Sequence, residues 1–91
     1  MKKMQDKSKL LHKVLGDLVT EIRIDKGIKY LDFCDGNSIA TSTYDNIVNG
    51  KTKVTFHNVY KIVKAFGLTF EQFGKLLDEH LPEDFWDNDD D

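Results

Sequence analysis

The chain has 91 residues, 40% of them hydrophobic and 11% aromatic, which is enough apolar material for one modest core. Its single cysteine excludes a disulfide framework and a zinc site built on cysteines. No apolar run approaches the length of a membrane helix, and the basic start of the chain is not followed by the apolar segment of a secretion signal. We therefore expect a soluble, cytoplasmic protein.

The net charge of −3 conceals an uneven distribution. Through Leu77 the chain has thirteen Lys and Arg against eight Asp and Glu, a net charge of +5, and six further acids fall in the last nine residues. A basic body with an acidic tail suits a nucleic-acid-binding protein, although many soluble domains share this balance. For the tail, three roles remain open: a solubilising end, a segment that binds a protein partner, or an autoinhibitory strip that competes with phosphates for the basic loop.

The first elements in chain order are a flexible basic segment and an amphipathic helix. Residues 1–9 are polar and basic, and we expect them to be flexible. From Leu10 to Ile22 the apolar residues recur at helical spacing, with Ser8 as the candidate N-cap and Gly27 as the stop.

Two short helices follow, one from about Tyr30 to Asp35, closed by Gly36 and Asn37, and one from about Thr41 to Asn49. Between them lies a turn of a few residues. This pair predicts a helix-turn-helix core over residues 30–49.

The last two helices are marked by their caps. Thr55 is the N-cap of a helix that stops at Gly67, and Thr69 forms a capping box with Gln72 that opens a final helix, which ends before Pro82. The sequence therefore predicts an all-α, compact five-helix domain over residues 10–82. An acidic, disordered tail over residues 83–91 follows, with Phe85 and Trp86 as a candidate anchor.

Several short motifs occur in a fixed order along this part of the chain. They are Ile22-Arg23, Gly27, Leu31–Cys34, Ser38-Ile39-Ala40-Thr41-Ser42-Thr43-Tyr44, Ile47, Asn49-Gly50-Lys51 and Phe66-Gly67-Leu68-Thr69-Phe70-Glu71-Gln72-Phe73. In these motifs and their spacing, Leu15–Phe73 resembles the lambda-repressor/Cro-like, or XRE-type, helix-turn-helix family. The resemblance implies a lambda-repressor-like DNA-binding domain and a sequence-specific transcriptional regulator that binds the major groove of double-stranded DNA.

A helix-turn-helix protein places the N-terminal part of its second helix in the major groove, where short polar side chains contact base edges. The resemblance assigns Thr41, Ser42 and Asn46 to base contacts, and Asp45 has the chemistry to accept from cytosine N4. The expected phosphate contacts lie on this helix, in the basic loop after it and around the first helix of the pair: Thr43, Asn49, Lys51, Thr52, Lys53, Lys29, Tyr30 and Arg23.

Three positions depart from the family pattern. Tyr30 stands where the family commonly has a phosphate-binding Gln, and Val48 stands where a Glu often pairs with the arginine of the first helix. Arg23 then has three open roles: a phosphate contact, or pairing with Asp45 or with Asp25. Cys34 replaces a small alanine and is expected to pack in the core, with a redox switch as the alternative.

Catalysis and metal binding are not expected. His12, His57 and His80 lie on three different predicted helices without ligand spacing, and no nucleophile motif is present. The sequence therefore predicts no enzyme activity, no metal and no cofactor.

The last helix has more apolar residues than one side of a small core needs. Its residues Phe70, Phe73, Leu77 and Leu81, extended by Phe85 and Trp86, predict a two-fold homodimer interface, unless they simply complete the monomer core. Because no ligand-binding or cleavage domain is appended in this sequence, we expect a repressor that acts by occupying its operator. The alternative is an antitoxin-like or adaptor module that binds a protein partner through the acidic tail or the last helix.

Overall fold

The computed structural model describes residues 2–85, and it describes side chains from Lys7 onward. The predicted anchor at Trp86 and the acidic residues from Asp87 to Asp91 lie outside the described residues.

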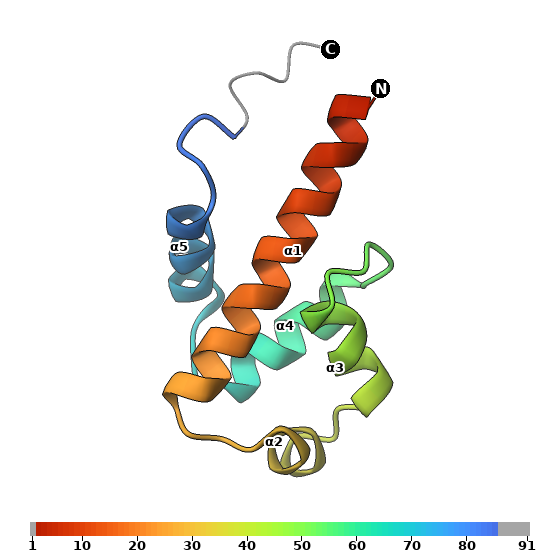
Figure 1. The fold of residues 1–91 in the computed structure, drawn as a ribbon. Helices are drawn as coiled ribbons and strands as arrows, with labels where there is room; N and C mark the ends of the chain where they lie inside the picture. The colour runs from red at the N-terminus through yellow and green to blue at the C-terminus, as the bar shows by residue number, and fades with distance from the viewer. Residues whose placement is uncertain (1, 86–91) are drawn as a thin grey trace.

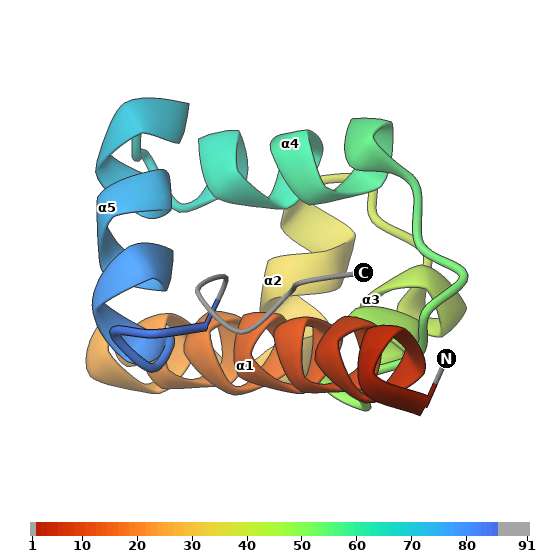
Figure 2. The same cartoon turned by 90° about the horizontal axis from the view of Figure 1, so that it is seen from above.

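Five α-helices and no strand make up residues 2–85: α1 Lys2–Asp25, α2 Tyr30–Gly36, α3 Thr41–Val48, α4 Phe56–Ala65 and α5 Phe70–His80. The long α1 crosses the molecule, with α5 on one side of it and α3 on the other (Figure 1). Seen from above, α1 and α4 lie along opposite edges of the molecule, and α2 lies between them in a lower layer (Figure 2). The predicted all-α five-helix fold is confirmed.

The start of α1 differs from the prediction. The helix begins at Lys2 instead of near Leu10, so Ser8 lies inside it and the prediction that Ser8 is its N-cap is wrong. The Ser8 carbonyl accepts a hydrogen bond from Nδ1 of His12 at 2.7 Å. Polar, straight-chain residues such as Lys and Gln have good helix propensity, so the first turns of α1 form without the apolar periodicity from which a helix is predicted.

The two predicted N-caps of the C-terminal half are confirmed. Thr55 precedes α4 and its hydroxyl accepts from the Asn58 amide at 3.2 Å. Thr69 accepts from the Gln72 amide at 3.1 Å, and the Gln72 side chain accepts from the Thr69 amide at 2.9 Å. This capping box satisfies two N–H groups that the first turn of a helix would otherwise leave without partners.

The core combines one face of α1 with the inner sides of the other four helices. Its buried residues are Leu15, Leu18, Val19, Ile22, Phe33, Cys34, Ile39, Tyr44, Ile47, Ile62, Val63, Phe66 and Phe73. Cys34 packs there as a small apolar side chain, and burial raises the pKa of its thiol. Phe73, which was predicted at a dimer interface, is only 1% exposed and completes the monomer core instead.

After α5 the chain returns towards the N-terminal half of α1. Phe85, one of the two residues expected to anchor the tail, is buried, and the Lys7 ammonium lies 5.7 Å from the centroid of its ring. Within residues 2–85 no helix is long and apolar enough to cross a membrane.

Candidate nucleic-acid interface

The helix pair α2 and α3 is joined by a turn that the rest of the fold holds in place. α2 ends at Gly36 with Asn37 as its C-cap, as expected, and the left-handed residue of the turn is Ser38, with a φ of +56°. The Asn37 amide donates to the Phe33 carbonyl at 2.8 Å. From α4, the Lys61 ammonium donates to the Ser38 carbonyl at 2.7 Å. These two bonds fix the turn, and with it the angle between α2 and α3.

The two faces of α3 have opposite character. Tyr44 and Ile47 are 2% and 1% exposed and lock the helix onto the core. Four side chains predicted to contact bases are exposed together on the other side of the helix: Thr41, Ser42, Asp45 and Asn46. Among the predicted phosphate contacts on this helix, Asn49 is exposed and Thr43 is half-buried. A short, rigid helix thus presents hydroxyl, carboxylate and amide groups to solvent.

Close packing of α3 against α1 depends on two glycines. A Cβ on Gly16 would lie 2.5 Å from the Ile47 carbonyl oxygen and 2.7 Å from that of Val48, so no side chain fits between the helices there. Gly50 follows α3 with a φ of +73°, a conformation that favours glycine. It also packs against the backbone of α1, because a Cβ added to Gly50 would lie 3.3 Å from the Cα of Lys13. Gly50 was predicted as the end of α3, whereas the role of Gly16 could not be predicted, because a single Gly within a helical pattern gives no local signal of what it packs against.

Arg23 has a structural role at the junction of α1, α2 and α3. Its Nε donates to the Tyr44 hydroxyl at 2.8 Å and its Nη1 donates to the Ile28 carbonyl at 2.8 Å. The side chain is half-buried and pairs with neither Asp45 nor Asp25, so the two ion pairs considered as alternatives are not formed. The Tyr44 hydroxyl and the Ile28 carbonyl therefore accept the hydrogen bonds of Arg23, in place of the glutamate that this chain lacks at position 48.

Tyr30 connects the start of α2 to the exposed face of α3. Its hydroxyl donates to Oδ1 of Asp45 at 2.8 Å, and this hydrogen bond is the main reason that the pKa of Tyr30 is raised. The proton that the sequence analysis assigned to a DNA phosphate is thus engaged by Asp45. The bond also orients Asp45 among the groups that α3 exposes.

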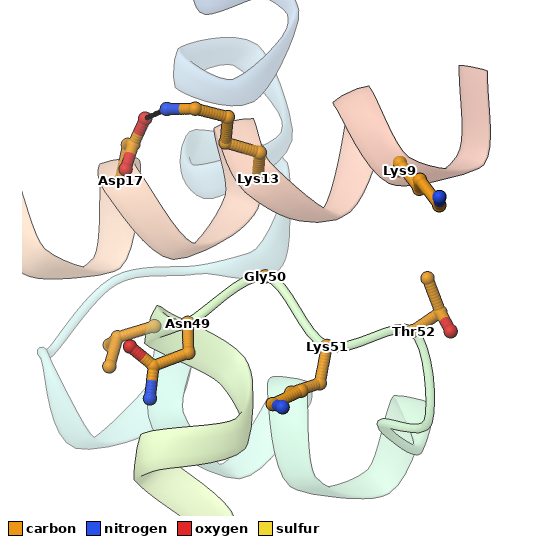
Figure 3. A pocket seen from close by; sticks show the side chains of 8 residues that line it. Lys9, Lys13, Asp17, Asn49, Gly50, Lys51 and Thr52 are labelled. Carbon is orange, nitrogen blue, oxygen red and sulfur yellow. Dashed lines mark hydrogen bonds and ion pairs between the residues drawn. The ribbon is translucent and has the colours of Figure 1, made fainter. Parts of the chain in front are cut away.

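The loop after α3 supplies exposed cations beside these polar groups. Lys51, Thr52 and Lys53 are all exposed, and with Asn46 they line an open hollow of about 330 Å³. Lys29, at the N-cap of α2, is exposed as well. A second hollow on the other side of the loop is lined by Lys9 and Lys13 of α1, which the sequence analysis did not consider (Figure 3).

A helix-turn-helix with one polar, exposed face on its second helix and cations beside it defines the class of DNA-binding proteins that insert this helix into a groove. A family model described as helix-turn-helix matches residues 19–73, which is more than half of the chain. The chain therefore belongs to the lambda-repressor-like, XRE-type helix-turn-helix family of DNA-binding transcription regulators. Searches of curated proteins and of solved structures gave no match.

Proposed function

We propose that this protein is a sequence-specific repressor that binds an operator as a homodimer, with one α3 helix of each copy in the major groove. The observation that supports the proposal most directly is the division of α3 into two faces. Tyr44 and Ile47 hold it in the core, while Thr41, Ser42 and Asn46 are exposed. A helix fixed in this way presents its polar groups in one arrangement, as base recognition requires.

In this proposal base edges and phosphates are contacted by different residues. Asn46 binds adenine through its amide, and Asp45 accepts from cytosine N4. Lys51 and Lys53 contact phosphates, which give affinity but no sequence preference. Repression follows from occupancy, because a protein seated in the groove of a promoter excludes polymerase from the same DNA.

The test is selection of bound duplexes from a random pool, followed by binding measurements on the selected site. Asn46→Ala should cost about 1–3 kcal/mol at one base pair and relax the preference there. Lys51→Gln should weaken binding to all sequences alike and flatten the salt dependence of affinity. If both variants bind every duplex as the parent does, α3 does not contact DNA. A pool that yields no preferred sequence would favour the alternative, a protein-interaction module on the same fold.

The proposed homodimer rests on an exposed aromatic cluster that we define as Phe56, Tyr60 and Phe70. Phe56 and Tyr60, on α4, are 68% and 43% exposed, and Phe70 opens α5. The ring centroids lie 5.2 Å apart for Phe56 and Phe70 and 5.5 Å apart for Tyr60 and Phe70. Exposed aromatic groups of this kind are typical of protein interfaces. Of the residues first predicted for this interface, Leu77 and Leu81 are half-buried, and Leu77 also packs against the monomer core.

The oligomeric state tests this part of the proposal. Phe56→Ser should shift the sedimentation equilibrium towards monomer, since a side chain this exposed contributes little to the monomer core. Leu31→Ser is the matched control, because Leu31 is also an exposed apolar residue, at 58%, but lies on α2. Equal association of the parent and both variants would place the interface elsewhere. A selected operator with half-sites about one helical turn apart would support the two-fold arrangement independently.

A further inference from the structure

A basic groove lies between α1 and the loop that follows α3. Lys9, Lys13 and Asp17 line it from α1, and Gly50, Lys51 and Thr52 line it from the loop. Its volume is about 630 Å³ and it is open to solvent. Figure 3 shows the Lys9 side chain extending from α1 towards Thr52. None of the DNA contacts inferred from the sequence includes a residue of this part of α1.

The position of the groove follows from the packing of two backbones. The loop crosses α1 at Lys13, because a Cβ on Gly50 would lie 3.3 Å from the Lys13 Cα. Lys9 is one helical turn closer to the N-terminus, so it faces the next loop residues, Lys51 and Thr52. The spacing of four residues places Lys9, Lys13 and Asp17 on one face of α1.

The two α1 lysines differ in their partners. In the part of the chain that the structure describes, the Lys9 ammonium has no hydrogen-bond or ion-pair partner. The Lys13 ammonium donates to Asp17 Oδ2 at 2.9 Å, and both side chains of this pair are largely exposed. Figure 3 shows the Lys13 side chain running along α1 to Asp17 and not towards the loop, so this pair holds the Lys13 ammonium away from Lys51 and Thr52. An exposed ion pair of this kind contributes little to stability, so its removal should leave the fold intact.

The groove and the hollow beside α3 lie on either side of the same loop. The hollow of about 330 Å³ beside Asn46 is lined by Lys51 and Thr52, and these two residues also line the groove at α1. Exposed lysines therefore follow one another from the loop after α3, at Lys53 and Lys51, to Lys9 on α1. Such a row matches the regular negative charge of a nucleic-acid backbone.

We propose that this groove binds a phosphodiester of duplex DNA, through Lys9, Lys51 and Thr52, and that Asp17 restrains Lys13 from joining them. The contact lies outside the part of the duplex that α3 recognises and extends the footprint along the backbone. This inference rests on the proposed function, because it presupposes that α3 occupies the major groove.

The first test compares Lys9→Gln with the parent in titrations of the selected duplex at several salt concentrations. The slope of log affinity against log salt should fall by about 0.9 for each protomer bound. Between 200 mM and 50 mM salt, the ratio of parent to variant affinity should therefore grow by about 3.5-fold per protomer. Lys75→Gln is the matched control, because it removes an exposed lysine on α5, a helix that lies across α1 from α3 (Figure 1). Lys9→Arg should retain the slope of the parent, which separates the charge from the packing of the side-chain stem.

The second test is Asp17→Asn, which releases Lys13. Affinity should rise and the salt slope should steepen, and adding Lys13→Gln to this variant should reverse both changes. The thermal midpoint of each variant, followed by circular dichroism, establishes that the fold is retained. The proposal is overturned if Lys9→Gln binds like Lys75→Gln, or if Asp17→Asn leaves the salt slope unchanged.

The two proposals fail in different ways. If the parent shows no salt-dependent, sequence-selective binding at all, the proposed function is wrong and the groove has no role in it. If Asn46→Ala and Lys51→Gln act as expected but the Lys9 and Asp17 variants do not, only the contact at α1 is wrong.

Discussion

Nε of Arg23 donates a hydrogen bond to the hydroxyl of Tyr44 across 2.8 Å, which joins the end of α1 to the middle of α3. Tyr44 is buried in the core, and burial raises the pKa of its hydroxyl although Arg23 lowers it. The second bond of Arg23, to the Ile28 carbonyl, holds the connection between α1 and α2 at the same point. One side chain thus fixes the helix pair relative to α1.

Tyr44→Phe should therefore lower the free energy of unfolding by about 1–2 kcal/mol, because a half-buried guanidinium N–H loses its acceptor. Urea unfolding measures this, and Tyr60→Phe is the control, since the Tyr60 hydroxyl has no partner among the described residues. The salt slope of DNA binding should stay as in the parent, because the hydroxyl contacts no phosphate. Equal stability of both variants with the parent would contradict the role given to Arg23.

Two glycine substitutions should have effects of opposite sign. Gly16→Ala places a methyl group 2.5 Å from the Ile47 carbonyl oxygen and should cost about 1–3 kcal/mol through overpacking. Gly74→Ala, in the middle of α5 with nothing within 4 Å of its Cβ, should stabilise the protein by up to about 1 kcal/mol through helix propensity. The thermal unfolding midpoints of the two variants, compared with that of the parent, measure both effects. A Gly16→Ala protein as stable as Gly74→Ala would show that α1 and α3 are not in close contact.

The stability of the α1–α5 contact should depend on pH. His80 Nδ1 bonds to the Leu76 carbonyl at 2.8 Å and Nε2 to Glu21 at 2.9 Å, and these bonds raise the pKa of His80 above its ordinary 6.5. A folded-state pKa above the unfolded value means that the added stability is complete below pH 6.5 and is lost as the pH rises through the folded-state pKa.

His80→Gln removes this contribution. The difference in unfolding free energy between the parent and His80→Gln should be larger at about pH 6 than at about pH 8. Glu21→Gln should reduce the pH dependence, because the carboxylate contribution to the raised pKa of His80 is lost. It should not abolish the pH dependence, because the bond to the Leu76 carbonyl remains. A difference that grows towards high pH would contradict the assignment.

Tyr30→Phe should change base preference without changing the salt slope. The hydroxyl of Tyr30 donates to Asp45, so its loss leaves Asp45 without an orienting partner while no phosphate contact is removed. Binding to duplexes that differ at single positions measures the preference. Asp45→Ala should relax the preference at the same base pair. The double variant Tyr30→Phe/Asp45→Ala should show the same preference as Asp45→Ala alone. A flatter salt slope in Tyr30→Phe would instead support the phosphate contact first inferred for this tyrosine.

Local signals in the sequence predicted most of the secondary structure. Thr55, Thr69 and Gln72 cap helices where expected, because a cap depends on residues within one turn of each other. The polar side of α3, with Thr41, Ser42 and Asn46, followed from the same short-range pattern and is exposed as expected. The polar first turns of α1 were missed because they carry no apolar stripe.

What the sequence by itself determined was the helix order, the caps and the helix-turn-helix motif over residues 30–49, since each depends on neighbours within a few positions. Only the tertiary structure decided which distant groups meet: Arg23 with Tyr44, Gly16 with the α3 carbonyls, and Lys9 with the loop after α3. It also placed Phe73 inside the core and left Phe56 exposed. Helical periodicity defines the faces of one helix, whereas the packing of all five determines what each face meets.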